Sequence, residues 1–290
     1  MILGFYLTPA HPSTKKIDND GKLMYTALKT SNVLTRQGAL MRATKLSVGG
    51  VMLCIGHRGA MGHAPENTLK SIAKALELGA PWVEVDVYPV EGHLVVIHDN
   101  RLERTTNGSG YVWEQTFSYL RTLDAGQGEK IPTLEEVLDL ISERAGINIE
   151  LKVPGTAVWV AKVIQDRIRT HWDVNNFLVS SFNHHEIVAV RQLDDRIRIG
   201  ALIAGLPLDY ALFAQKLGAY SVHQSIEFVN REFIADAHDR NLKVFVYTVN
   251  HPEDIARMDA MGVDGVFTNY PDRVLSFLGS KSDSRPRRVK

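Results

Sequence analysis

The stretch from Ile55 to Asp99 contains side chains that are suited to phosphoryl transfer. It begins IGHRGAMGHAPENTL and continues, after a helix-like segment, as VEVDVYPVEGHLVVIHD. Glu84 and Asp86 are two positions apart in a valine-rich run, so on a β-strand both side chains leave by the same face. A buried charge is costly unless it is paired or binds a metal ion. The two acids therefore indicate a functional site rather than an ordinary core strand.

A hairpin after Asp86 would bring a histidine back to these acids. The chain passes a turn signal at Glu91-Gly92 and returns as LVVIHD. If the hairpin is centred there, facing residue numbers sum to about 183. Position 97 then faces Asp86, and His98 lies beside the two carboxylates.

Composition predicts one large domain and disfavours several classes of protein. The chain has 290 residues, of which 44% are hydrophobic, enough for a substantial core. Lys+Arg and Asp+Glu are both 33, so no net charge recruits nucleic acid or an anionic membrane. The single cysteine, Cys54, excludes an intrachain disulfide and fits a reducing compartment. We therefore expect no nucleic-acid partner and a cytoplasmic protein.

Neither a membrane span nor a secretory signal is expected. No apolar run approaches the roughly 20 residues that a membrane-spanning helix requires. The first residues, MILGFYLTPAHP, lack a basic segment before a short apolar run, which makes a poor signal peptide. Stable membrane insertion is thus not predicted, and oligomeric state leaves no readable mark.

The chain divides into three unequal parts. Residues 1–50 are polar and weakly periodic, and we predict a poorly ordered N-terminal extension. Residues 51–278 have a continuous α/β pattern. Residues 279–290 include SKSDSRPRRVK, a small, polar and basic run that predicts a disordered tail.

The middle part alternates β-rich runs with amphipathic helical segments. The predicted strands are Leu53–His57, Val83–Val87, Ile147–Lys152, Phe177–Ser181, Ile197–Leu202, Ala219–His223, Val244–Thr248 and Gly265–Thr268. The predicted helices are Thr68–Leu78, Leu134–Arg144, Val158–Thr170, His184–Leu193, Leu208–Leu217, Arg231–Asp239 and Pro252–Met261. This pattern predicts an α/β fold, a (β/α)8 TIM barrel with a small β-hairpin insertion after the second strand. A doubly wound open sheet is the alternative, but HRGAMG is not the GxGxxG loop that such a sheet uses for phosphates.

A barrel would gather the chemical residues at one end. Active sites in this fold lie at the C-terminal ends of the strands. The residues at or near such ends are His57, Glu84, Asp86, Glu150 and Lys152. Three carboxylates from two strands suit Mg²⁺ or Ca²⁺. His57 and His98 could exchange protons near neutral pH, and Arg58 and Lys152 could bind a phosphate.

The ordered motifs resemble the glycerophosphodiester phosphodiesterase family. They are HRG, PENT, the ExD pair, VVIHD followed by LERTT, DAG with IPTLEEVL, NIELK, the Ser181-Phe182 pair, VYTVN and GVDGVFTNYP. The resemblance covers about residues 52–275. It implies a TIM barrel that hydrolyses glycerophosphodiesters, such as glycerophosphocholine and glycerophosphoethanolamine, to sn-glycerol 3-phosphate and an alcohol. A divalent metal would activate the glycerol 2-hydroxyl or a water and neutralise developing charge.

The same resemblance implies a role for each site residue. The catalytic histidines would be His57 and His98, one as acid and one as base, in an order that the sequence leaves open. The implied metal ligands are Glu84, Asp86 and Glu150, and the implied substrate-binding residues are Arg58, Lys152 and Tyr247. Tyr247 stands where relatives often have Trp, which could alter leaving-group preference. Head group and physiological metal remain open.

Two other functions are weighed against hydrolysis of small diesters. A related phosphodiesterase acting on lysophospholipids should carry an apolar docking loop around the mouth, and none stands out between the predicted elements. A catalytically silent binding barrel should lack a histidine or carboxylate, and all are present. Among other histidines, His63 is expected in a loop role, whereas His223 could be structural or could face the site.

Overall fold

The computed structural model describes residues 51–283, so the predicted N-terminal extension lies outside the described residues. The strands are β1 (Leu53–Gly56), β2 (Trp82–Val90), β3 (His93–Val96), β4 (Gly146–Leu151), β5 (Phe177–Ser181), β6 (Arg198–Ile203), β7 (Ser221–Ser225), β8 (Lys243–Tyr247) and β9 (Gly265–Thr268). The helices are α1 (Leu69–Glu77), α2 (Phe117–Leu120), α3 (Leu134–Ile141), α4 (Ala157–Thr170), α5 (His184–Leu193), α6 (Leu212–Leu217), α7 (Arg231–Asp239), α8 (Pro252–Met261) and α9 (Pro271–Asp283). Short 3₁₀ turns cover Val112–Glu114 and Val174–Asn176.

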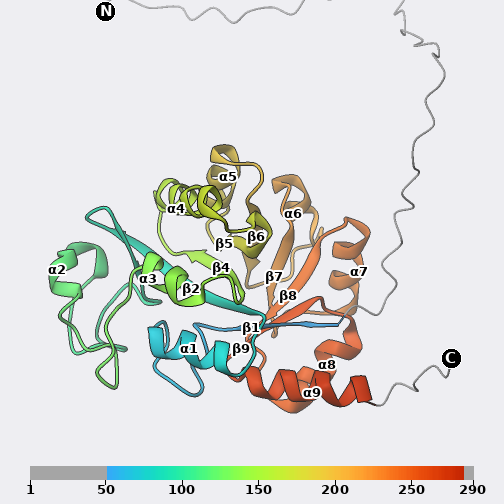
Figure 1. Ribbon diagram of the computed structural model, residues 1–290. Helices are drawn as coiled ribbons and strands as arrows, with labels where there is room; N and C mark the ends of the chain where they lie inside the picture. The colour runs from blue at the N-terminus through green and yellow to red at the C-terminus, as the bar shows by residue number, and fades with distance from the viewer. Residues whose placement is uncertain (1–50, 284–290) are drawn as a thin grey trace, which may run out of the picture. The chain divides into compact units, whose positions relative to one another are not determined.

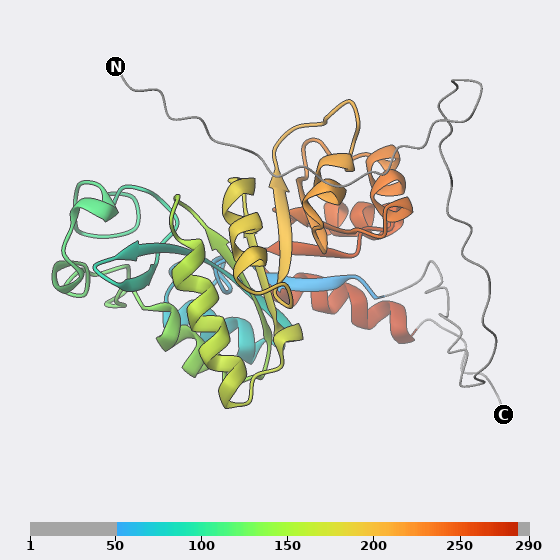
Figure 2. The same ribbon diagram turned by 90° about the horizontal axis from the view of Figure 1, so that it is seen from above.

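The parallel strands close into a barrel. Within the described residues the sheet order is β1-β9-β8-β7-β6-β5-β4-β2, and β1 pairs with β2 to close it. Every one of these pairings is parallel. Helices lie around the outside of the strands (Figures 1 and 2). The predicted (β/α)8 TIM barrel is confirmed.

The hairpin after β2 has the predicted register. β3 pairs antiparallel with β2, with Val87 opposite Val96 and Tyr88 opposite Val95. The Ile97 N–H donates to the Asp86 carbonyl at 3.0 Å, which brings the chain back to the acids. In both pairs the residue numbers sum to 183, as the turn at Glu91-Gly92 predicts. The position of His98 therefore follows from the turn.

The insertion that begins with this hairpin is larger than predicted. It continues to residue 133 and includes α2, which lies to one side of the barrel strands in Figure 1. It has its own small core, whose members are Tyr88, Val90, Val95, Ile97, Leu102, Val112, Leu120, Leu123, Ala125 and Ile131. The sequence interpretation missed this because the helical pieces between the turns are only three or four residues long.

Two predicted boundaries differ from the structure by four residues or more. Helix α6 begins at Leu212 rather than Leu208, because Tyr210 has a φ of 47°, outside the right-handed helical region, and Leu208 is exposed in the loop. Helix α9 continues to Asp283, so the predicted disordered tail does not begin at 279. Buried Val274 and partly buried Leu278 pack α9 on the core, and this packing outweighs the polar composition after Leu278.

Gly146 is required where β4 lies against β2. A Cβ there would lie 2.3 Å from the Trp82 ring, because the two residues are partners across the strands. We expect Gly146→Ala to lower the free energy of unfolding by about 1 to 3 kcal/mol. Gly205→Ala is the control, since a Cβ there meets nothing within 4 Å. Urea unfolding of both variants checks this, and equal midpoints would contradict it.

Candidate active site

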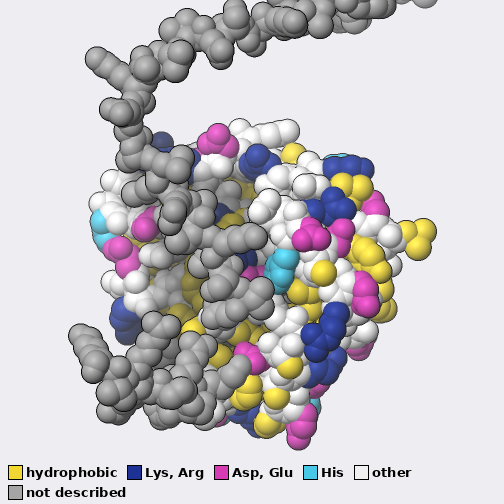
Figure 3. All heavy atoms as spheres, turned by 90° about the vertical axis from the view of Figure 1, so that its right-hand side faces the viewer, with side chains coloured by type: hydrophobic (Ala, Val, Ile, Leu, Met, Phe, Trp, Pro, Cys, Tyr) yellow, Lys and Arg dark blue, Asp and Glu magenta, His cyan; other side chains and the backbone are white. Residues whose placement is uncertain are grey.

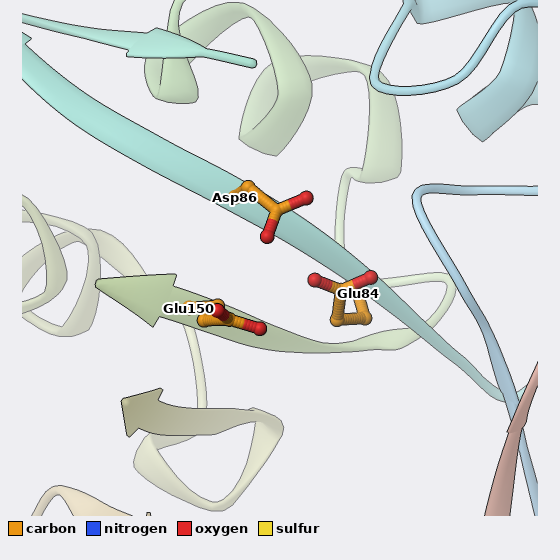
Figure 4. Close-up of side chains that lie close together, drawn as sticks. All are labelled: Glu84, Asp86 and Glu150. Carbon is orange, nitrogen blue, oxygen red and sulfur yellow. The ribbon is translucent and has the colours of Figure 1, made fainter. Parts of the chain in front are cut away.

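Three carboxylates from two neighbouring strands meet inside the mouth of the barrel. Glu84 and Asp86 lie on β2, and Glu150 on β4 lies directly across from Asp86. One oxygen from each of the three lies within 4.8 Å of the others. Figure 4 shows the three side chains pointing toward one another. The structure thus brings together the predicted metal ligands.

The cluster has more negative than positive charge and is poorly satisfied. Glu84 and Asp86 are only 2% and 1% exposed. Lys152 Nζ lies 2.7 Å from Glu150 Oε1 and 3.3 Å from Asp86 Oδ1, and Arg58 Nε is 3.5 Å from Asp86 Oδ2. Among the described residues, Glu84 Oε1 and Asp86 Oδ1 have no hydrogen-bond partner. Such unsatisfied hard oxygens fit a divalent cation like Mg²⁺ or Ca²⁺.

The acidities of the three carboxyls reflect this crowding. Burial, and then the charges of Asp86 and Glu150, raise the pKa of Glu84 well above its usual range. Burial and the charge of Asp86 raise the pKa of Glu150 to about 7. Burial also acts on Asp86, but Lys152 and Arg58 hold its pKa below the usual value. Asp86 is therefore stable as an anion. Ionising Glu84 or Glu150 beside it costs free energy unless a further cation is bound.

The HRG and PENT segments build the wall beside this cluster. Arg58 has φ 51°, and its backbone N–H donates to Glu84 Oε2 at 2.8 Å. The next residue, Gly59, needs to be glycine, because its φ is +82° and a Cβ would lie 2.5 Å from the Ser71 carbonyl carbon. Asn67 Nδ2 donates to Asp86 Oδ2 at 2.8 Å. The backbone turn thus uses main-chain and amide donors to orient two carboxylates.

His57 follows β1 and lines the cavity from a partly buried position. Its Nδ1 lies 2.7 Å from Asn269 Oδ1. An amide oxygen can only accept, so the proton is on Nδ1 and Nε2 carries a lone pair. Burial, and then the charge of Arg58, lower the pKa of His57 to about 4. His57 is therefore a neutral imidazole with an accepting nitrogen.

His98 follows β3 and is held by a carboxylate instead. Its Nδ1 lies 2.6 Å from Asp99 Oδ1. Arg104 donates to both Asp99 oxygens, at 2.5 and 2.9 Å, and to both Glu66 oxygens, at 2.7 and 2.8 Å. Glu66 Oε1 also accepts from Arg58 at 2.7 Å. Arg104 thus ties the insertion to the PENT loop and fixes His98 relative to Arg58.

A cavity of about 210 Å³ connects these groups. Its lining residues are His57, Arg58, Glu84, His98, Asn148, Glu150, Ser180, Phe182, Leu202, His223, Tyr247, Thr248 and Phe267. Of the predicted substrate-binding residues, Arg58 and Tyr247 line it, and Lys152 contacts the carboxylates instead. Tyr247 donates its hydroxyl proton to the Ile203 carbonyl at 2.9 Å, so its ring is held in the wall.

Several contacts were missed from the sequence. Thr68 caps α1, and its neighbour Asn67 donates to Asp86, a contact that the PENT motif alone did not reveal. Asn269 was not singled out, although it lies in the FTNYP run that follows β9. The Arg104–Glu66 pair spans 38 positions, and no local pattern could have indicated it. Only the order of the motifs carried that signal.

His63 and His223 lie outside the carboxylate cluster. His63 Nε2 lies 2.7 Å from Asp272 Oδ1 near the surface, in keeping with its expected loop role. His223 is fully buried against Phe245 and Phe267, with Nε2 2.8 Å from Ser221 Oγ. Burial lowers the pKa of His223 to about 3, so it is a neutral part of the cavity floor.

The rest of the described surface gives two further findings. No helix within residues 51–283 has the length and apolarity needed to cross a membrane. On the face shown in Figure 3, basic and acidic side chains are interspersed where the described residues are visible. That visible part carries no basic stripe of the kind that follows a nucleic-acid backbone.

Known proteins share both the sequence and the fold of this chain. The model of the glycerophosphoryl diester phosphodiesterase family matches residues 57–273. A glycerophosphodiester phosphodiesterase of Caldanaerobacter subterraneus is 35% identical, over 78% of this chain and 97% of its own. One from Bacillus subtilis is 32% identical, over 76% and 84%.

Solved structures of similar proteins have the same fold. A phosphodiesterase of Oleispira antarctica, in complex with the product sn-glycerol-3-phosphate, superposes with a TM-score of 0.73 at 31% identity, covering 79% of this chain and 97% of its own. A glycerophosphodiester phosphodiesterase of Agrobacterium tumefaciens gives 0.67 at 27% identity, covering 78% and 99%. With the family model spanning the barrel and its carboxylate cluster, the chain belongs to the glycerophosphoryl diester phosphodiesterase family of phosphoric diester hydrolases.

Proposed function

We propose that the protein hydrolyses glycerophosphodiesters, such as glycerophosphocholine and glycerophosphoethanolamine, to sn-glycerol 3-phosphate and an alcohol in a metal-dependent reaction. The observation that carries the proposal is the cluster of Glu84, Asp86 and Glu150 at a cavity that also exposes two histidines and Arg58. The named activity of the relatives and the bound product of the Oleispira antarctica enzyme support it.

The carboxylate cluster and two basic side chains would bind the phosphodiester. A divalent cation held by the three carboxylates would polarise the phosphoryl group and offset the negative charge that develops on it. Arg58 Nε has no hydrogen-bond partner among the described residues, although it is buried, and it is therefore available to a phosphate oxygen. Lys152 would balance charge beside Glu150 and Asp86.

The different partners of the two histidines suggest which is base and which is acid. His57 is hydrogen-bonded to a neutral amide and its ring is neutral. Its Nε2 would therefore accept the proton of the nucleophile, either the glycerol 2-hydroxyl or a water. Burial lowers the pKa of His98, but its contact with Asp99 favours the protonated ring. His98 would therefore donate a proton to the departing alkoxide.

We also propose that the protein is cytoplasmic and that the barrel over residues 51–278 carries the activity. The sequence contains a single cysteine, Cys54, and this usage fits a reducing compartment. Fractionation of the cells that make the protein tests the location. Recovery of the protein in an extracellular fraction would contradict it.

A turnover assay tests the proposed reaction. Purified protein is incubated with glycerophosphocholine, glycerophosphoethanolamine and glycerophosphoglycerol, and sn-glycerol 3-phosphate is measured with a coupled dehydrogenase. We expect this product with Mg²⁺ or Ca²⁺ present. Release of phosphocholine and glycerol instead would mean that the other phosphoester bond is cleaved. No turnover of any diester would favour the silent binding barrel.

A further inference from the structure

The LERTT segment lies in the insertion, a few residues after His98, and its arginine reaches back to the active site. Leu102 is fully buried in the small core of the insertion. The N–H and the hydroxyl of Thr106 both donate to the Leu102 carbonyl, at 3.0 and 2.8 Å, and so close a tight turn. Arg104 lies within this turn. The insertion core therefore anchors the loop from which the Arg104 side chain extends.

Arg104 joins two carboxylates that come from different parts of the chain. It donates to both oxygens of Asp99 and to both oxygens of Glu66, so each carboxylate forms a paired interaction with the same guanidinium. Glu66 belongs to the PENT loop, and only 9% of its side chain is exposed. A planar guanidinium fits this double contact, whereas the ammonium of a lysine acts as a point charge. We call Arg104, Asp99 and Glu66 the clamp.

The clamp connects the proposed general acid to the proposed phosphate-binding arginine. At one end, Asp99 Oδ1 lies 2.6 Å from His98 Nδ1. At the other end, Glu66 Oε1 accepts from Arg58 Nη1 at 2.7 Å. His98 has to reach the departing oxygen of a phosphodiester that Arg58 binds. The clamp therefore fixes the relative position of two groups that the reaction needs in register.

The backbone of His98 is held independently of the clamp. The Tyr88 hydroxyl donates to the His98 carbonyl at 3.2 Å. The Ile97 N–H donates to the Asp86 carbonyl at 3.0 Å. Removal of the Arg104 guanidinium would therefore leave the main chain of His98 in place. It would release the Asp99 carboxylate and, with it, the orientation of the imidazole ring.

We propose that Arg104 is a positioning residue for the general acid, because it holds Asp99 against His98 Nδ1 and so leaves Nε2 to face the leaving group. This inference rests on the proposed phosphodiesterase function. In that reaction the bond from phosphorus to the head-group oxygen breaks, and this oxygen takes the proton from His98 Nε2. Arg104 exchanges no proton and does not touch the substrate. The insertion thereby carries the residue that orients the acid.

The Arg121–Glu136 pair provides a matched control in the same insertion. Arg121 donates to both Glu136 oxygens, at 2.8 and 2.7 Å, and joins the insertion to α3. Arg121→Met removes a paired contact of the same kind without changing the clamp. The Arg104 side chain is 47% exposed, and ion pairs so exposed add little to stability. We therefore expect Arg104→Met to fold, which its melting temperature checks.

The test compares two leaving groups in the Arg104→Met variant. The substrates are glycerophosphocholine, whose alkoxide needs a proton, and glycerol p-nitrophenyl phosphate, whose phenolate does not. With glycerophosphocholine we expect kcat to fall by about 10- to 100-fold. KM should change little, since Arg58 keeps its bond to Glu66. With the aryl diester kcat should stay within about threefold of wild type, and Arg121→Met should match wild type on both.

A double variant and a conservative variant separate positioning from general loss of structure. If Arg104 acts only through His98, His98→Gln/Arg104→Met should be no slower than His98→Gln alone. Arg104→Lys keeps the charge but cannot pair with both carboxylates, so it should be as slow as Arg104→Met.

Several outcomes would overturn the positioning role. They are multiplied losses in the double variant, equal losses of Arg104→Met on both diesters, the same losses in Arg121→Met, and a wild-type rate in Arg104→Lys. Each of them leaves the phosphodiesterase function standing, because wild-type protein still releases sn-glycerol 3-phosphate.

The His98 ring can also be observed without turnover. Long-range ¹H–¹⁵N spectra of histidine-labelled protein, at a pH where the ring is neutral, show which nitrogen carries the proton. The His98 signals are those missing from His98→Gln. We expect the proton on Nδ1 in wild type and Arg121→Met, and a mixture of both tautomers in Arg104→Met. Unchanged signals in Arg104→Met would overturn the proposal. The expected change in a wild-type protein that hydrolyses no diester would support the clamp and reject the phosphodiesterase function instead.

Discussion

Glu84→Gln is expected to lower turnover by about 10² to 10³ and at the same time to stabilise the metal-free protein. The loss follows because one of the three carboxylates proposed to hold the cation is replaced by a weaker neutral donor. The gain follows because Glu84 is buried between Asp86 and Glu150, whose charges raise its pKa. Its amide analogue can still accept from the Arg58 N–H and can donate to an unsatisfied carboxylate.

Thermal unfolding with EDTA and with added Mg²⁺ or Ca²⁺ separates these effects. In EDTA the variant should be more stable than wild type, by on the order of 2 kcal/mol. Added metal should raise the Tm of wild type and leave that of the variant nearly unchanged. EDTA should also abolish wild-type turnover, and the added cation should restore it.

Asp139→Asn is the matched control for removing a negative charge. Asp139 is exposed on α3 and pairs only with Arg167, at 2.6 Å, among the contacts described. It should change neither turnover nor the metal-induced shift in Tm. Full wild-type activity in EDTA, or an unstable metal-free Glu84→Gln, would remove the metal from the proposed reaction.

Period-two spacing and the hairpin turn were enough to predict the carboxylate cluster. Glu84 and Asp86 share a face because a strand alternates, and Glu150 joins them because β4 pairs with β2 in register. The return of His98 followed from the turn at Glu91-Gly92. These features are local or depend on one strand pairing, so sequence carries them.

Contacts that depend on the closed barrel were not predictable in the same way. Asn269 directly follows β9 and holds His57, and the two residues are 212 positions apart. The start of α6 was misplaced for a related reason. An apolar residue before a helix reads as its first buried turn, and only the tertiary structure shows that α6 starts later.

The two histidines are expected to respond differently to the leaving group. His57→Gln and His98→Gln should each lower turnover of glycerophosphocholine by about 10² to 10⁴, the range of general acid–base catalysis. With glycerol p-nitrophenyl phosphate the leaving phenolate departs without a proton. His98→Gln should then recover most of the wild-type rate, while His57→Gln should stay slow because its nucleophile still needs a base.

His185→Gln on the surface of α5 is the control, and it should match wild type on both substrates because its side chain is exposed. Melting temperatures show whether each variant is folded. Equal losses of His98→Gln on the alkyl and aryl diesters would contradict its role as the acid. Recovery of His57→Gln instead would reverse the assignment, and with it the argument that the partner of Nδ1, neutral Asn269 or anionic Asp99, decides which ring carries the proton.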